Sequence, residues 1–551
     1  MAVLGVVLAC AEKPWAGPGA RHLAKGRALR FEEIVDIQLW WAGLSVFIGL
    51  GLMLALSGWW MKAARVGLPE PGIGLAAPLR NAKPWTRPHS WALAGILLLG
   101  LAFRLPRMDR FMERDEQDTV RRSMIGYVPL DREGKPEGPP VVHPWSMTVW
   151  ECAQSNNPFL FSIAARVTAR TWQFLSGAPP WSVSLRALRL PSLIAGLLGL
   201  AALVRLGKMS GDPHLGLVAG LLAAVHPMHV EYSTQARGYG MVLLFVPLAM
   251  AAIWQGLRTG RWSAWWAGAA ALLGLLSANP GSIYAAVCLG VFLTIFILAK
   301  WRSHPETAPL SLARWFIASG TAGLIYLPLI LPALPQAIAF LKTMKGSLDG
   351  LWVLMTWSQY GAGICYPPME ITQPWAQSGK DAMDFLRQGY FSTEPVLAIF
   401  LAIAIPWALW RGIRWWRGQS GFGPLLAASI AAPLAAWLMH RGPDTPFLFH
   451  WYLIYSLPPL LLLIAAALRE AGGKCATITN RPWTAALPVL LYLTVFLAIN
   501  RPGPGRIFWW GHQSTGAEIY NRGKYEWTTL TNGITYRKLL PGKSEKKSSD
   551  H

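Results

Sequence analysis

Long apolar runs alternate with short polar and basic segments along almost the whole chain. An α-helix needs about 20 apolar residues to cross a bilayer. The pattern therefore predicts an all-α, polytopic membrane protein with about twelve spans, at 38–60, 89–105, 188–205, 214–228, 239–257, 262–278, 281–299, 312–333, 395–410, 422–439, 447–468 and 483–499.

One further run, 157–175, has helical apolar spacing but carries Arg166 and Arg170 in its middle. Charges at the centre of a bilayer are costly. We therefore expect this segment to be an amphipathic helix that lies at the membrane interface.

The positions of the basic residues predict how the chain is oriented in the membrane. Clusters of Lys and Arg follow many of the predicted spans, and they all fall on the cytoplasmic side only if 157–175 does not cross. The outer face then receives the loops 106–187, 229–238, 334–394 and 440–446 and the C-terminal tail 500–551. The orientation of the first span, 38–60, stays open.

Composition agrees with a membrane protein. Of the 551 residues, 53% are hydrophobic and 14% are charged, against about 25% charged in soluble proteins. The net charge of +22 would suggest nucleic acid in a soluble protein. Here the basic residues stand at helix ends, where they meet anionic headgroups, so no nucleic-acid partner is predicted. No zinc-type cysteine spacing is present.

The outer loop 334–394 is unusually long, and loops of that length are commonly functional or disordered. Its aromatic residues favour an ordered cover: Trp352, Trp357, Tyr360, Tyr366 and Trp375. Cys365 lies in this loop and Cys152 in the first outer loop. A disulfide between them and two separate thiols are both consistent with the sequence.

Acidic residues gather just after the span 89–105, at Glu113, Asp115, Glu116 and Asp118. A carboxylate at the membrane surface can act as a general base or coordinate a metal. A solvated, charged loop is an equally good interpretation of this cluster alone.

A second cluster runs from His226 to Tyr239 at the outer end of a span. Arg237 at this depth needs an anionic partner, either a lipid phosphate, which guanidinium binds bidentately, or an internal carboxylate such as Glu231. His226 and His229 lack an identified third ligand, so structural roles are favoured over a metal site.

Two weaker groups complete the candidates. Arg186 and Arg189 share a helix face at the outer start of a span, where they could bind a phosphate, although anchoring at headgroups is slightly favoured. His440, Arg441 and the run His450-Trp451-Tyr452 flank the outer end of 447–468, where aromatic residues are typical of an interfacial belt.

In this order and spacing the motifs resemble the GT-C superfamily of membrane glycosyltransferases. The branch is that of protein O-mannosyltransferases and bacterial aminoarabinose-type lipid A transferases. The resemblance covers about 89–260 and rests on four motifs: Asp115-Glu116, Asn157-Pro158-Phe159-Leu160, Leu188-Arg189-Leu190-Pro191-Ser192 and Tyr232-Ser233-Thr234-Gln235-Ala236-Arg237-Gly238-Tyr239.

The resemblance implies a multi-pass enzyme of the cell (inner) membrane. It would move a sugar, with inversion, from a polyprenyl-phosphate donor to a lipid, glycan or protein acceptor on the outer face. Asp115 would be the general base, with Glu116 beside it at the catalytic position. The remaining roles are donor-phosphate binding by Arg237, Arg189 and Arg186, and substrate binding by Glu231, Tyr232, Tyr239, His450 and Tyr452. No metal and no cofactor is implied.

On this interpretation the chain has three parts. Residues 1–88 are an extension with one extra span and a cytoplasmic linker, residues 89–499 are the catalytic membrane domain, and residues 500–551 are the tail. Trp451-Tyr452 stands where relatives often have Arg-Tyr, and Gln117-Asp118 follows the acidic pair, so the sugar and the acceptor stay unassigned. The alternative function is a transporter or flippase, which is typically built from inverted repeats around a midplane site.

Overall fold

A computed structural model describes residues 1–65, 84–343 and 422–499, apart from 111, 113, 132, 134, 153–156, 443–444, 446–447 and 449. It also describes 356–357, 360–361, 363, 406 and 410, and three short segments of the tail. Glu113, Cys365, the linker residues 66–83, most of the loop 334–394 and most of the predicted span 395–410 lie outside the described residues.

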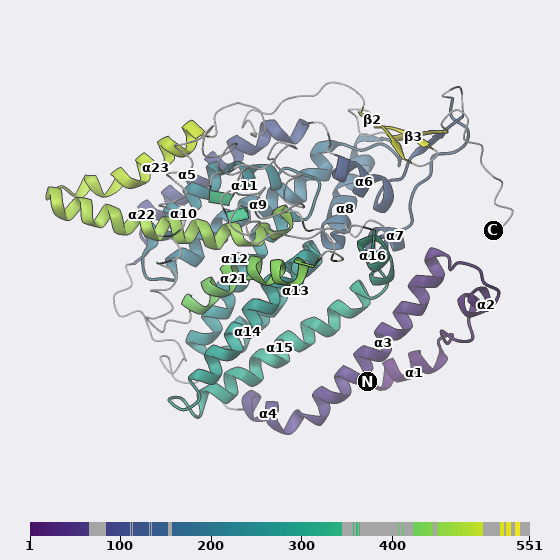
Figure 1. Ribbon diagram of the computed structural model, residues 1–551, viewed down its shortest axis with the longest axis horizontal. Coiled ribbons are helices and arrows are strands. Elements are labelled where there is room, and N and C mark those ends of the chain that lie inside the picture. Colours follow the sequence, from purple (N-terminus) through teal and green to yellow (C-terminus); the bar gives the residue numbers. More distant parts are fainter. Residues whose placement is uncertain are drawn as a thin grey trace.

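The described chain is mostly helical, with a few short strands (Figure 1). Its helices are α1 (Ala2–Cys10), α2 (Pro18–Ala24), α3 (Phe31–Ala55), α4 (Ser57–Arg65), α5 (Arg87–Arg104), η1 (Leu105–Asp109), α6 (Arg114–Ser123), α7 (Trp145–Trp150), α8 (Phe159–Ser176), α9 (Leu185–Lys208), α10 (Pro213–Val225), α11 (Pro227–Tyr232), α12 (Tyr239–Thr259), α13 (Trp262–Ala278), η2 (Pro280–Ser282), α14 (Ile283–Ala299), α15 (Thr307–Ile330), α16 (Leu334–Leu341), α21 (Phe422–His440), η5 (His450–Ser456), α22 (Leu457–Thr479), η6 (Pro482–Ala486) and α23 (Leu487–Ile499).

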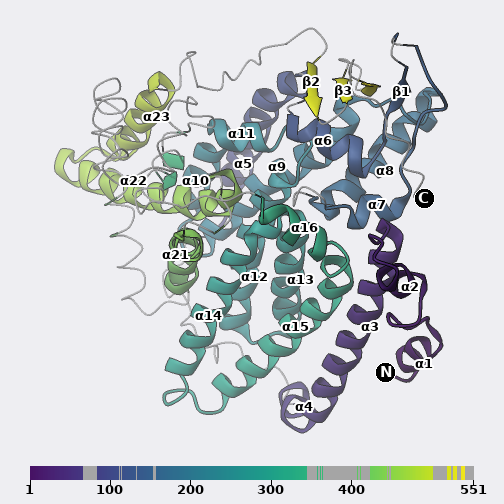
Figure 2. The same ribbon diagram turned by 45° about the vertical axis from the view of Figure 1, so that its right-hand side comes forward.

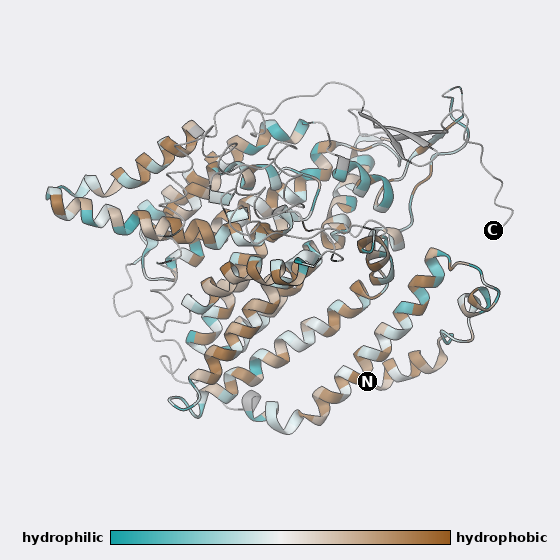
Figure 3. Ribbon diagram, viewed as in Figure 1, coloured by the Kyte–Doolittle hydropathy of each residue, from teal (hydrophilic) through white to brown (hydrophobic). Residues whose placement is uncertain are grey.

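Within the described residues, eight helices are long and apolar enough to cross a membrane, and three more apolar helices are shorter. The predicted all-α, polytopic architecture is confirmed, whereas the count of twelve spans is not reached in this part of the chain. Hydrophobic residues follow the long helices, and hydrophilic residues gather around α6 (Figure 3).

Helix α8 occupies the predicted amphipathic segment 157–175 and is not among the eight long apolar helices. One side of it is buried, with Phe161, Ala165 and Arg166, while Phe174 and Leu175 are exposed. Arg166 is buried because its guanidinium donates to the Pro144 carbonyl and stacks over Trp145.

The centre of the bundle is formed by α9, α10, α12 and α22. Helices come unusually close where glycines face a neighbouring backbone. A Cβ at Gly216 would meet the Val204 carbonyl oxygen at 2.2 Å, and one at Gly199 would meet the Leu243 carbonyl oxygen at 2.9 Å. In lipid, helices have no hydrophobic driving force for association. Small residues at such crossings stabilise the packing through close van der Waals contact instead.

The N-terminal helices stand at one side of the bundle, where α3 packs against α15 and α1 folds back along α3 (Figure 2). A small sheet, not predicted from the sequence, joins the tail to the first outer loop. Its order is β1-β4-β3-β2, with β1 (Val128–Leu130) parallel to β4 (Thr535–Leu539), and with β2 (Glu518–Arg522) and β3 (Tyr525–Thr529) completing an antiparallel meander. The strands of the tail therefore lie beside the segment that follows α6.

Candidate active site

The site is built where the chain leaves α5 and turns into α6. Pro106 ends the α-helix because it has no N–H to donate, and the chain continues as the 3-10 turn η1. Asp115 and Glu116 then occupy the first turn of α6. Carboxylates are favoured at this end of a helix, where backbone N–H groups give a partial positive charge.

Asp115 is paired with Arg237, which follows α11 in the chain. The distance from Arg237 Nη1 to Asp115 Oδ2 is 2.7 Å, and the exposed side-chain fractions are 5% for Arg237 and 45% for Asp115. The guanidinium also lies 4.7 Å from the centre of the Tyr239 ring. In this pair, a solvent-accessible carboxylate is bound to a buried cation.

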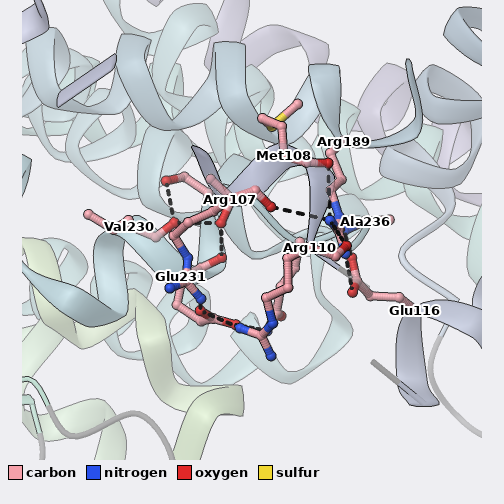
Figure 4. Close-up of polar contacts among 11 residues, drawn as sticks. Arg107, Met108, Arg110, Glu116, Arg189, Val230, Glu231 and Ala236 are labelled. Atoms are coloured by element: carbon pink, nitrogen blue, oxygen red, sulfur yellow. Dashed lines mark hydrogen bonds and ion pairs between the residues drawn. The ribbon is translucent and has the colours of Figure 1, made fainter. Parts of the chain in front are cut away.

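Glu116 points the other way, into the protein, where it is 1% exposed. Its two oxygens accept bonds from Arg189 Nε at 3.1 Å and Nη2 at 2.9 Å, and it also accepts the backbone N–H of Ala236. Arg189 Nη1 donates in turn to the carbonyls of Arg107, Met108 and Arg110 (Figure 4). Glu116 therefore ties α6 to α9 and to the residue before Arg237.

Glu231 anchors the same region from α11. Its carboxylate is 1% exposed and pairs with Arg107 and with Arg110, whose Nη1 lies 2.8 and 3.0 Å from the two oxygens (Figure 4). Gln235 donates to it as well, at 2.9 Å. The internal partner of Arg237 is consequently Asp115, and not Glu231, which was the internal alternative that the sequence offered.

A buried layer of polar contacts lies behind these pairs. Arg104 donates to Ser233 Oγ at 2.7 Å and contacts His229 Nδ1 at 2.8 Å. His226 Nε2 bonds the Tyr360 carbonyl at 2.7 Å. Both histidines are thus held by protein groups, and no cluster of three or more His, Cys, Asp or Glu side chains occurs in the described part of the chain.

Gly238 allows the Arg237 segment to approach its neighbours. A Cβ at this position would lie 2.0 Å from the Ala278 carbonyl oxygen and 2.8 Å from Pro158. The Asn157-Pro158 motif is held in place by a bond from Asn157 Nδ2 to the Thr148 carbonyl at 2.9 Å. The four motifs of the sequence thus converge on one region.

The structure brings some of the remaining predicted residues to the Asp115–Arg237 pair and not others. Tyr232 and Tyr239 stack edge to face at 5.0 Å, and Tyr452 lies near enough to Arg237 to interact electrostatically. The His450 side chain lies outside the described part. Arg186 is not brought to the pair, because it is 73% exposed and bound to Asp109 at 2.6 Å on the surface.

Sequence reasoning missed Arg104, Arg107 and Arg110, which hold α11 in place. A signal was present, since three arginines spaced every three residues end an apolar helix in LAFRLPRMDR. Charges at such a position need partners.

Residues 181–334 match the family described as dolichyl-phosphate-mannose-protein mannosyltransferase. The predicted resemblance to membrane glycosyltransferases is confirmed over this segment. It includes Arg186, Arg189, Glu231 and Arg237, whereas Asp115 and Glu116 precede it. The family match supports a multi-pass membrane glycosyltransferase. The comparison with curated protein sequences found no match.

Solved structures of an oligosaccharyltransferase from the archaeon Archaeoglobus fulgidus are similar at a distance. The complex of that enzyme, AglB, with an inhibitory peptide and a dolichol-phosphate has a TM-score of 0.42 and 11% identity, covering 75% of this chain and 56% of its own. The complex with zinc and sulfate has a TM-score of 0.43 and 12% identity, covering 74% and 52%. This chain therefore spans a little over half the length of those proteins.

Proposed function

We propose that this protein transfers a sugar from a polyprenyl-phosphate donor to an acceptor hydroxyl or amine, with Asp115 as general base and inversion at the sugar carbon. The proposal places the reaction on the outer face of the cell's inner membrane. It rests on one observation above all, the pairing of a solvent-accessible carboxylate with the buried cation Arg237 at 2.7 Å.

Arg237 is suited to hold a phosphate. Its Nη2 is buried and forms no well-aligned hydrogen bond to the described residues, while Nη1 is bound to Asp115. A buried guanidinium binds phosphate oxygens strongly because water does not compete. The donor phosphate would therefore take a place beside Arg237 and draw it away from Asp115, whose carboxylate would then be available to the acceptor.

The reaction then proceeds in one displacement. The acceptor oxygen or nitrogen attacks the anomeric carbon while its proton moves to Asp115. The bond from that carbon to the phosphate oxygen breaks, and the polyprenyl phosphate leaves with its charge stabilised by Arg237. Attack on the face opposite to the leaving group inverts the configuration.

The other residues fit supporting roles in this proposal. Glu116 and Arg189 are bound to each other. This favours a role for both in positioning Asp115 and Arg237 over direct contact with the donor. Glu231 likewise fits positioning, since its carboxylate is bound to arginines of η1 and the turn after it. Tyr232, Tyr239 and Tyr452 stand around Arg237 and fit binding of the donor headgroup.

The test is mass spectrometry of lipid that co-purifies with the protein, wild type beside Asp115→Asn and Arg237→Ala. We expect a glycosylated polyprenyl phosphate to accumulate in Asp115→Asn, because donor binds without turnover. Arg237→Ala should lose it, since removing a charged hydrogen bond costs about 1.5–3 kcal/mol of donor binding. Only bulk phospholipid in all three samples, or full transfer by Asp115→Asn, would refute the proposal.

A further inference from the structure

Helix α9 has two faces of different character. Arg189 and Ser192 point inward, where Arg189 binds Glu116 and Ser192 Oγ donates to the Arg237 carbonyl. Leu190, Ile194 and Leu198 follow a four-residue spacing on the opposite face and are 39%, 49% and 53% exposed. The outward face belongs to a helix long and apolar enough to span the membrane, so hydrocarbon chains are its natural surroundings.

A groove runs along this outward face, between α8 and α9. Its upper part, about 870 Å³, is bounded by Trp172, Leu175, Arg186 and Leu190. Its lower part, about 480 Å³, continues past Ile194 and Leu198 to α12. Both parts are lined by Thr168, so they meet on α8.

The dimensions of the groove fit one lipid chain. From Arg186 to Leu198 the helix rises about 18 Å, at about 1.5 Å per residue. One leaflet of hydrocarbon is about 15 Å thick. An acyl chain in the groove would therefore run from the headgroup level to near the middle of the bilayer.

The mouth of the groove carries a cation. Arg186 is the one charged residue among the described residues that line either part. Its Nε and Nη2 bind Asp109, at 2.7 and 2.6 Å, and Nη1 has no bond to the described part of the protein. Because both partners are exposed, the pair contributes little and a phosphate can share or replace it.

We propose that this groove binds an anionic phospholipid of the bilayer, with its phosphate on Arg186 and one acyl chain along Leu190, Ile194 and Leu198. We assign the groove to a phospholipid and not to the reacting donor, because the α9 residues that contact Glu116 and Arg237 lie on the opposite face of the helix. The phospholipid is thus a bound lipid beside the catalytic centre and does not depend on the proposed reaction.

The experiment is native mass spectrometry of the full-length protein in detergent, titrated with phosphatidylglycerol or phosphatidylcholine. Wild type should bind one phosphatidylglycerol more tightly than phosphatidylcholine. Arg186→Ala should weaken phosphatidylglycerol about fivefold, the effect of one cation at a membrane surface. Arg205→Ala, an exposed arginine at the other end of α9, is the matched control and should bind as wild type does.

A second variant tests the groove itself. Leu190→Trp narrows the groove beside Arg186 and should weaken binding of phosphatidylglycerol, whereas Val291→Trp, on the exposed side of α14, should leave binding intact. Equal affinity for the two lipids in wild type, or unchanged phosphatidylglycerol binding in Arg186→Ala or in Leu190→Trp, would overturn the proposal. So would loss of an added polyprenyl phosphate, and not of phosphatidylglycerol, in Arg186→Ala, because the groove would then serve the donor.

Discussion

At the scale of single residues, the feature that organises this protein is the pairing of buried charges. Glu116 with Arg189, and Glu231 with Arg107, are each at most 2% exposed. A charge held inside a protein is tolerable only while its partner is in place. These pairs therefore hold α6, η1, α9 and α11 in one arrangement and, with them, the Asp115–Arg237 pair.

We predict that Glu116→Gln is strongly destabilising although it changes no volume. It leaves the Arg189 charge buried without its counter-ion, which costs about 3–5 kcal/mol. Thermal unfolding in detergent measures this. Asp109→Asn makes the same chemical change in an exposed pair and should cost about 1 kcal/mol or less. Equal shifts in unfolding temperature for the two variants would contradict the buried-pair argument.

A second residue-scale prediction concerns His143, before α7. Burial is the main cause that lowers the pKa of its imidazole. The bond to the Arg121 carbonyl raises the pKa in part, and the nearby charges of Arg166 and Arg121 lower it further. Above the ordinary pKa of about 6.5 the folded and unfolded forms are both neutral. Below it the unfolded form takes up a proton more readily, so stability should fall as pH decreases.

The measurement is unfolding temperature against pH, wild type beside His143→Gln. The amide of Gln can donate to the Arg121 carbonyl but does not titrate in this range. The variant should therefore lose part of the decline below about pH 6.5. A decline of the same size in both proteins would show that His143 does not contribute.

At the scale of elements, α8 shows what the spacing of apolar residues predicts and what it does not. Its apolar spacing predicted a helix and the structure contains it, with Phe174 86% exposed. The arginines in its middle suggested that it does not cross the membrane. Arg166 is buried against Thr148 and Pro144, so it faces protein and not water, a choice that periodicity alone does not specify.

The position of α8 in the membrane is tested by cysteine labelling in a cysteine-free background. Arg170→Cys should react with a membrane-impermeant maleimide added from the same side as Glu133→Cys, an exposed position in the first outer loop. Arg302→Cys, exposed after α14, should react only from the opposite side. Labelling of Arg170→Cys together with Arg302→Cys would reverse the predicted topology.

At the scale of the whole molecule, the tail and the first outer loop are joined by the strand pairing of β1 with β4. Strand β1 begins five residues after α6 ends, so this pairing bears on the helix that carries Asp115. Long-range strand pairing adds main-chain hydrogen bonds between parts of a chain that are far apart in sequence. We therefore expect strand β4 to restrain the segment that follows α6.

Truncation after residue 517 removes β2, β3 and β4 and tests this. We expect faster amide hydrogen exchange in residues 114–130, because β1 loses its partner and α6 is less restrained. Exchange in α9 and α12 should stay as it is, since the bundle is intact. Unchanged exchange throughout would show that the tail strands do not support the site.

The sequence by itself determined the class of the protein and the chemistry available to it. Apolar runs near the length of a bilayer require helices, because unpaired backbone groups are too costly in lipid. Charged residues just beyond these runs, or in their first turn, lie near the membrane surface, so Asp115, Glu116, Arg189 and Arg237 stood out as candidates. The resemblance to membrane glycosyltransferases is confirmed over residues 181–334, a segment that includes Arg189 and Arg237.

Only the tertiary structure decided which of these charges meet. Pairing depends on the direction of each side chain and on how helices approach through glycines such as Gly238, and neither is written in spacing along the chain. Arg237 thus pairs with Asp115 and not with Glu231, Arg189 binds Glu116, and Arg186 binds Asp109 on the surface. The tail sheet was unpredictable for the same reason, since β1 is three residues long and exists only through its distant partner β4.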